Sequence, residues 1–419
     1  MEKKGAFRQT IFACYRGYVT QAIVNNLAPL LFIIFQTQFS LSFAMIGNLI
    51  LLNFGTQLVV DVVVVKFAER IGYRRLVVLA HILCAAGLAA LGVLPNVMGV
   101  PFAGMVIAVV LYAMGGGMIE VMISPIVDAV PGDDKASAMS LLHSFYSWGQ
   151  VLVVLLTTFV LGWIGQGLWF LLPLAWAALP VYNAIRFAKV PLAPMAAEHE
   201  KIPIRKMLAS KVFIIAMVLM LCAGAAELTM AQWASLFAEK AVGVPKVTGD
   251  LLGPCLFAAL MGVGRTVYGI FGKKINLTLA LTVSASLCIL SYLLASLSGH
   301  PAISLAGLAL CGFSVSLMWP GVISYSAAHF SAGGTAMFGI LAICGDFGCS
   351  VGPWVTGMVS ASVEAAPGAL AGLGGLAPDQ LGLRAGLLVG IVFPVVMLAG
   401  VLAMRWTKEH KKLQTAERG

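Results

Sequence analysis

Long apolar runs recur along the whole of this 419-residue chain, and they restrict what it can fold into more than any other feature. A helix needs about 20 apolar residues to cross a bilayer. Only 10% of the residues here are charged, whereas a soluble domain carries about a quarter. The chain is therefore predicted to be an all-α membrane protein with twelve transmembrane helices. We expect the spans at residues 10–36, 43–66, 76–94, 101–126, 139–162, 167–188, 211–238, 250–271, 277–298, 302–325, 335–358 and 383–404.

The basic residues lie in short clusters between the apolar runs, although the formal net charge is +9. Such clusters indicate topology, because Lys and Arg concentrate on the cytoplasmic side of a membrane, and they do not predict a nucleic-acid partner. If the N-terminus is cytoplasmic, the outside segments hold only Lys240, Lys246 and Arg384. We therefore expect a multi-pass protein of the plasma (cytoplasmic) membrane with both termini cytoplasmic. The N-terminus has no small-residue cleavage site, so it is expected to stay as part of the first helix.

The longest polar interruption falls between the sixth and seventh spans and divides the chain into two halves. Ser137-Ala138-Met139 opens the fifth span and Thr335-Ala336-Met337 opens the eleventh, which suggests that the halves are distant copies. Six-helix repeats around a midplane cavity are a transporter architecture. We expect an N-terminal six-helix bundle at 1–188, a cytoplasmic linker at 189–210, a C-terminal six-helix bundle at 211–404 and a cytoplasmic tail at 405–419.

Four acidic residues lie inside predicted spans, where an ionisable group is costly and usually functional. Glu120 follows three glycines and has no Lys or Arg nearby in its own span, so it is expected to exchange a proton near neutral pH. We predict proton coupling by Glu120 and Glu227, and solute binding by Glu227 and Asp346. For each, the alternative is a structural acid that hydrogen-bonds to a neighbouring helix. Asp61 lies near the cytoplasmic end and near Lys66, so a gating or packing salt bridge is expected there.

Amide side chains form stripes on several spans. Asn53 and Gln57 are four residues apart and share a helix face, and similar groups lie in the first and fifth spans. Such stripes favour a wet cavity lined by hydrogen-bond donors and acceptors. A histidine there could relay protons or simply bond to a neighbouring helix. The predicted solute-binding polar groups besides the acids are Asn25, Asn26, Asn53, Gln57, His143 and Gln150.

Indole rings complete the predicted solute site. A sugar has an apolar C–H face that can rest on an indole and a hydroxyl edge that pairs with amides. Trp233 in the seventh span and Trp319, which with Pro320 breaks the tenth, are the candidates. Trp163 and Trp169 are explained by the membrane interface, where tryptophan is common.

The segment KFAERIGYRR, residues 66–75, resembles the loop after the second helix of the major facilitator superfamily. The loop's leading glycine is absent here. In that family the acid and arginines of this loop bridge neighbouring helix ends and stabilise one side of the alternating-access cycle. The resemblance implies gating roles for Glu69, Arg70, Arg74 and Arg75.

Within the superfamily the chain looks most like the fucose:proton symporter branch. GGGMIEVMISP, with Glu120, resembles the branch's fourth helix, and SLLHSFYSWGQ, with His143, its fifth. ELTMAQWASLF resembles its seventh helix, and GVGRTVYG, with Arg265, its eighth; Arg265 is added to the gating set. In that branch the fourth-helix carboxylate takes part in proton-coupled sugar transport. Fucose permeases carry an aspartate in the first helix, where this chain has Asn25 and Asn26, so coupling here would depend on Glu120, Glu227 or both.

The leading hypothesis is a secondary transporter that imports a small neutral polar solute, a sugar foremost, by proton (or Na⁺) symport. The alternatives are an exporter of cationic amphiphiles and a non-transporting membrane sensor. Anionic solutes are disfavoured because the acids have no mid-membrane bases beside them. Neither an enzyme motif nor a Cys/His metal spacing is present, so we expect no catalysis, disulfide, metal or cofactor. A monomer is the family expectation.

Overall fold

The computed structural model describes residues 7–131, 135–193, 204–271, 276–330, 334–367 and 375–416. All the regular structure in these residues is helical, and twelve helical stretches are long and apolar enough to cross a membrane. This confirms the predicted all-α membrane fold. The helices of the first six spans are α2 (Arg8–Phe39), α3 (Phe43–Ile71), α4 (Tyr73–Val97), α5 (Pro101–Ala129), α6 (Lys135–Ile164) and the pair α7 (Leu171–Trp176) and α8 (Ala178–Lys189), preceded by η1 (Gln166–Leu168). The last six spans are formed by α10 (Lys211–Leu236) with η2 (Phe237–Ala241), α11 (Lys246–Asp250) with η3 (Leu251–Cys255) and α12 (Leu256–Phe271), α13 (Leu277–Leu297), α14 (Pro301–Val315) with α15 (Met318–His329), α16 (Gly334–Ala365), and α17 (Pro378–Val389) with α18 (Val392–Ala416); the short α9 (Ile204–Leu208) precedes them.

Local chemistry explains several helix boundaries. The Ser42 side chain accepts a hydrogen bond from the Met45 N–H and caps α3, and Asn276 caps α13 in the same way. Pro101 occupies the first turn of α5, where its missing N–H is no loss. The tenth span breaks between Val315 and Met318, directly before the Trp319-Pro320 pair, as expected from the sequence.

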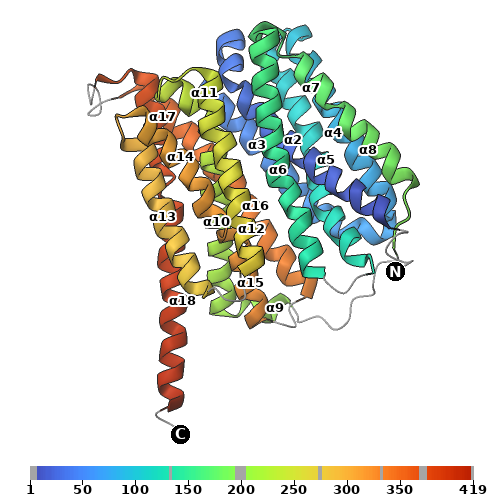
Figure 1. Ribbon diagram of the computed structural model, residues 1–419, viewed down its shortest axis with the longest axis vertical. Helices are drawn as coiled ribbons and strands as arrows, with labels where there is room; N and C mark the ends of the chain where they lie inside the picture. The colour runs from blue at the N-terminus through green and yellow to red at the C-terminus, as the bar shows by residue number, and fades with distance from the viewer. Residues whose placement is uncertain are drawn as a thin grey trace.

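Figure 1 shows the N-terminal helices, blue to green, grouped beside the C-terminal helices, yellow to red. Within the first group α4 packs on α5, and within the second α10 packs on α16. Between the groups α3 packs against α16 and α6 against α12. Residues 194–203 of the predicted linker 189–210 lie outside the described residues, and its role stays a prediction.

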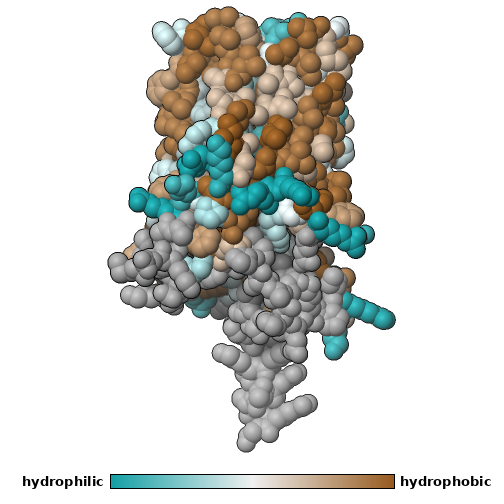
Figure 2. All heavy atoms as spheres, turned by 90° about the vertical axis from the view of Figure 1, so that its right-hand side faces the viewer, coloured by the Kyte–Doolittle hydropathy of each residue, from teal (hydrophilic) through white to brown (hydrophobic). Residues whose placement is uncertain are grey.

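Both described termini lie toward the same end of the helices (Figure 1), which we call the terminal end; the other is the opposite end. The face seen in Figure 2 is apolar over most of its height and carries hydrophilic residues in a belt near the terminal end. Apolar side chains such as Val59 and Val62 are exposed on the helix surfaces. An apolar belt of this extent fits a bilayer rather than water.

At the opposite end, the two groups of helices are joined by a buried acid. Asp250 accepts hydrogen bonds from Ser235 (2.5 Å) in its own half and from Thr158 (2.9 Å) of α6, and Lys246 lies 3.1 Å from its Oδ2. Asp250 is only 1% exposed, so each lost partner leaves a charge poorly compensated.

Helices α3 and α16 also approach closely at the opposite end. A Cβ on Gly357 would lie 2.9 Å from the Gly47 Cα, so only glycine permits this spacing. One turn away, the Trp354 indole donates to the Asn48 side chain at 3.0 Å. Together with the Asp250 cluster, these contacts hold the opposite end closed.

We predict that Thr158→Val will partly open the opposite end, because it removes the hydrogen bond from α6 to Asp250 while preserving side-chain volume. A loss of about 1 to 2 kcal/mol would raise the open-to-closed ratio about 5- to 30-fold. Electron–electron distance measurements between spin labels at Val97 and Leu297, which are 70% and 62% exposed at that end, would report the change. Cys344, the one native cysteine that is not buried, is replaced by serine in every variant.

Thr157→Val is the matched control. Thr157 accepts a hydrogen bond from Trp176 (3.3 Å) within the same half, so its loss should leave the distance distribution unchanged. Equal shifts in both variants would show that the effect comes from general loosening of α6.

Candidate functional site

Four amides from α2 and α3 form a buried hydrogen-bonded cluster. Gln57 donates to Asn25 (2.9 Å) and Asn53 (3.1 Å), and Asn53 donates to Asn25 (3.3 Å). Gln21 donates to the Gln57 side-chain oxygen at 2.9 Å. Because an unpaired amide in a bilayer is costly, the two helices are held in the one relative rotation that lets the amides satisfy one another.

Glu120 joins this cluster from α5. The Gln21 amide donates to the Glu120 carboxylate at 3.1 Å, so Gln21 connects the acid to the amides of α3. A Cβ on Gly116 would lie 3.2 Å from the Gln57 Oε1 and 3.3 Å from the Gln21 Oε1, which explains the glycines before the acid. The Gln21 Oε1 is buried without a hydrogen-bond partner. The cluster therefore holds an unused acceptor beside a protonatable group.

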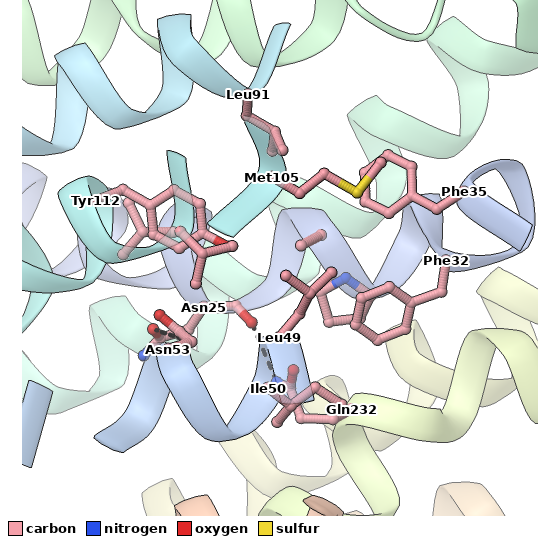
Figure 3. Close-up of a pocket in the computed structure, with 14 residues that line it drawn as sticks. Asn25, Phe32, Phe35, Leu49, Ile50, Asn53, Leu91, Met105, Tyr112 and Gln232 are labelled. Atoms are coloured by element: carbon pink, nitrogen blue, oxygen red, sulfur yellow. Dashed lines mark hydrogen bonds between the residues drawn. The ribbon is translucent and has the colours of Figure 1, made fainter. Parts of the chain in front are cut away.

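A small pocket adjoins the amides on the side of the opposite end (Figure 3). Its volume is about 10 Å³, which is room for about one water molecule. Figure 3 shows Asn25 and Asn53 together at one side and Phe32 and Phe35 at the other. Gln232 reaches the pocket from α10 and donates to the Asn25 backbone carbonyl at 3.1 Å, so the second half contributes directly to the amide cluster.

Glu227 and Arg265 form an ion pair between α10 and α12. The Arg265 guanidinium donates to both Glu227 oxygens, at 3.1 and 3.2 Å, and to Ser147 of α6 at 3.3 Å. The expectation that the acids have no mid-membrane base is therefore wrong for Glu227. The acid lies in the seventh span and the arginine in the eighth, so neither span alone reveals the pairing.

Asp61 and Asp346 meet between α3 and α16. The two carboxyl groups face each other across these helices, and both residues are buried. A Cβ on Gly117 would lie 2.9 Å from the Asp61 Oδ1, so α5 approaches this pair closely. The expected salt bridge from Asp61 to Lys66 is wrong: the described Lys66 ammonium lies over the Phe67 ring, 5.7 Å from its centroid. Asp61 is buried, whereas Lys66 is exposed on a different face of α3.

The other predicted polar ligands share the inner face of α2 and α6. Asn26 donates to the Ala22 carbonyl (2.9 Å) and to the Tyr146 hydroxyl (3.4 Å). Gln150 is buried, whereas His143, nearer the terminal end, is exposed and lies edge-on to Tyr18 with ring centroids 5.1 Å apart. The inner face of α6 is thus reached by solvent from the terminal end and sealed further in.

The two candidate tryptophans lie in different surroundings. Trp233 is fully buried, donates to the Pro353 carbonyl (3.0 Å) and packs on Phe43. In this conformation its ring is packed inside the closed opposite end. Trp319 is half-buried and lies over Gly345, beside Asp346, where only glycine leaves room for the ring.

Of the loop that resembles the superfamily motif, Arg74 makes the clearest contact. Its guanidinium donates to the carbonyls of Phe187 (2.8 Å) and Ala188 (3.0 Å), which ties the start of α4 to the end of α8. A cation here satisfies carbonyls that the helix end leaves free. Arg70 and Arg75 are exposed, and the Glu69 side chain lies outside the described residues.

Sequence reasoning missed three residues that the structure joins to the predicted set: Gln232, Tyr146 and Asp250. Gln232 directly precedes Trp233, and Tyr146 lies three residues after His143, so both are polar neighbours of predicted positions. Asp250 stands at the first residue of the predicted eighth span, where a charged residue is ordinary.

We predict that Arg265→Ala will destabilise the protein, because it leaves the Glu227 carboxylate buried without its counter-charge. Breaking such a pair costs about 3 to 5 kcal/mol, which should lower the midpoint of thermal unfolding in detergent by several degrees. Arg265→Ala combined with Glu227→Gln should recover much of that loss.

Lys240→Ala is the control, since its 3.9 Å ion pair with Asp379 is about one-third exposed and should contribute under about 1 kcal/mol. Strictly additive effects of the Arg265 and Glu227 substitutions would contradict the coupling.

Comparisons with known proteins agree with this geometry. The model of the Major Facilitator Superfamily matches residues 17–353. No curated protein matches. Among solved structures, a bacterial homologue of the human lysosomal transporter Spinster, in an inward-facing and occupied conformation, is similar with a TM-score of 0.74 at 17% identity, covering 94% of this chain and 96% of that one.

Two further structures share the fold, each of a single-residue mutant. The nucleoside transporter NupG gives a TM-score of 0.73 at 13% identity, covering 95% of this chain and 99% of that one. The E. coli fucose:proton symporter FucP gives 0.64 at 14% identity, covering 94% and 98%. The match of the family model over most of the chain confirms the predicted superfamily. The chain belongs to the major facilitator superfamily, whose members are membrane transporters rather than enzymes.

Proposed function

We propose that this transporter imports a small neutral polar solute, a sugar foremost, together with protons. The observation that carries the proposal is the continuous hydrogen-bond path from the amides of α3 through Gln21 to Glu120. A polyhydroxylated solute can replace amide–amide hydrogen bonds one for one, because each hydroxyl both donates and accepts. Because Gln21 bonds to both Gln57 and Glu120, a solute that replaces the amide hydrogen bonds would also affect the Glu120 carboxyl group.

The charge balance favours a neutral solute. Arg265 offsets the charge of Glu227, and the amide cluster itself is neutral. Because Arg265 pairs with Glu227, that acid is not available as a counter-charge for a cationic amphiphile. The ion pair therefore supports a sugar over an exported cation. The charge of Arg265 is in turn offset by Glu227, so the arginine attracts an anion only weakly.

Glu120 is the proposed coupling group. Its carboxylate accepts one described amide hydrogen bond, from Gln21. Gly116, one turn earlier on α5, lies against the neutral side chains of Gln21 and Gln57. A charged carboxylate in such a place is costly when the site closes to water. Protonation removes that charge, so the loaded carrier can pass through its closed state, and release of the proton on the other side frees the solute.

The two halves would share the work of binding. We assign solute contacts to the amides Asn25, Asn26, Asn53 and Gln57, and to the α6 residues His143 and Gln150; Gln232 is added on its contact with Asn25. Trp319 and Asp346 stand together as candidate contacts from the second half, whereas Trp233 would contribute only after the opposite end opens. Glu227 is proposed to act with Arg265 as one unit.

The relatives guide the choice of test solutes. FucP is a fucose:proton symporter and NupG a nucleoside transporter. Both kinds of solute carry ring hydroxyls and no net charge. A panel of labelled monosaccharides and nucleosides should therefore be offered to proteoliposomes under an inside-alkaline pH gradient and, separately, under a Na⁺ gradient. We expect one monosaccharide to accumulate with the pH gradient.

The outcomes separate the alternatives. Accumulation of a nucleoside would keep proton symport and change the solute class. Accumulation that follows Na⁺ alone would remove proton coupling. If no neutral solute moves, cationic compounds come next, and movement of these out against a proton gradient would support the exporter.

We predict that Glu120→Gln will abolish uphill accumulation and spare exchange of solute down its own gradient. Glutamine mimics the protonated acid in shape and keeps its hydrogen bond with Gln21, but it cannot release a proton. Glu364→Gln, which changes an acid at the far end of α16, should accumulate solute as the wild type does. Accumulation by Glu120→Gln under a pH gradient would remove Glu120 from the coupling role.

A further inference from the structure

A hydrogen bond between the Asp61 and Asp346 carboxyls would require a proton. Carboxylates only accept hydrogen bonds, so two of them can bond to each other only when one carries a proton. Both residues are more than nine-tenths buried, at 6% and 7% exposed. Water is therefore poorly placed to separate the two groups, and in contact they have the chemistry of one proton shared by two carboxyls.

No base among the described residues neutralises the pair. Lys66, on the same helix as Asp61, turns to the Phe67 ring. From α5 the nearest titratable group is Glu120, and on α16 itself the thiols of Cys344 and Cys349 lie nearby. The Asp61 Oδ1 is buried without a hydrogen-bond partner. Every neighbouring charge is thus negative, and one carboxyl oxygen is free to take a proton.

The pair also has a defined level along the interface of the two halves. Contacts between α3 and α16 run from Gly47 with Gly357 at the opposite end, through Gly55 with Ser350, to Asp61 with Asp346 nearest the terminal end. The antiparallel register is regular, so these contacts form one seam between α3 and α16, and of the three the pair lies nearest the terminal end. Whatever separates these two side chains opens the seam from the terminal end.

We propose that Asp61 and Asp346 form a second proton-binding site, separate from Glu120, whose shared proton holds the terminal ends of α3 and α16 together. With the proton bound, the O–H of one carboxyl donates to the carboxylate of the other, across the interface of the two halves. When the proton leaves to water, two carboxylates face each other and repel, and the seam opens at the terminal end. This goes beyond the proposed function, because it concerns closure and needs no solute.

The test is a pH titration of the opening without solute. Spin labels at Ile71 of α3 and Leu208 of α9, which are 44% and 43% exposed, report the distance between the halves at the terminal end, in the same Cys344→Ser background. For the wild type we expect the open-to-closed ratio to rise with pH, by at most about tenfold per pH unit, since one proton is released.

Asp346→Asn should remove this response and keep the closed state at every pH, because the amide still donates to the Asp61 carboxylate after the titratable proton is gone. Asp61→Asn should do the same with the roles exchanged, and it gives a second reading if one variant folds poorly. A wild-type ratio that does not change with pH, or an Asp346→Asn variant that responds as the wild type does, would overturn the proposal. A wild-type response to Na⁺ at constant pH would overturn it in favour of a cation site.

Two variants separate this site from the others. Glu120→Gln should retain a pH response at the terminal end even though it loses uphill transport, with the midpoint moved at most to lower pH because a neighbouring negative charge is gone. Loss of the response in this variant would assign the proton to Glu120 and overturn the second site. Asp250→Asn changes the buried acid that joins the halves at the opposite end, and it should also retain the response. If both retain it and both Asp61 and Asp346 variants lose it, the second site is established whether or not the proposed solute is correct.

Discussion

The cost of an unsatisfied polar group in a bilayer is the constraint on which this structure depends. A helix satisfies its own backbone N–H and C=O groups, but a side-chain amide or carboxyl must find a partner on another helix. Asn25, Asn53 and Gln57 do so by pairing across α2 and α3, and Gln21 extends the chain of bonds to Glu120. The polar groups that a solute would use are therefore the groups that fix the helix rotations. Binding site and fold specificity have the same physical origin.

Glycine determines where those polar groups can meet. Gly116 and Gly117 bring α5 against the amides and the Asp61 carboxyl, and Gly47 with Gly357 brings α3 against α16. Without hydrophobic attraction between helices in lipid, close van der Waals packing and interhelical hydrogen bonds provide the association. A seam built of small residues can separate and close again without leaving large cavities. This property suits a protein whose halves must change partners during each cycle.

The sequence was sufficient for the spans and for the faces of single helices. Hydropathy predicts twelve crossings because each must match the same bilayer thickness, and the four-residue spacing of Asn53 and Gln57 predicts their shared face. The sequence could not predict which side chains pair between helices, because the periodicity of one helix does not give the rotation or register of its neighbour. Glu227 therefore looked like an acid without a counter-charge, and Asp61 was assigned to the wrong partner. Gln232 was missed because it lies five residues after Glu227, about 140° around α10. It is therefore on a different helix face from the acid, and that face was not predicted to line the site.

The seam between α3 and α16 differs in chemistry from one end to the other, and this difference bears on how transport can be made directional. At the opposite end, Gly47 with Gly357 and Asn48 with Trp354 are neutral contacts, whose strength does not depend on pH. At the terminal end, the proposed hydrogen bond between Asp61 and Asp346 forms only with a proton. If the terminal end is cytoplasmic, as the distribution of basic residues predicts, the more alkaline side of an energised membrane weakens one end of the seam and leaves the other unchanged. A single pair of helices could then open preferentially toward one side. The proposed coupling at Glu120, which is in contact with Gln21, would tie the solute to a separate proton.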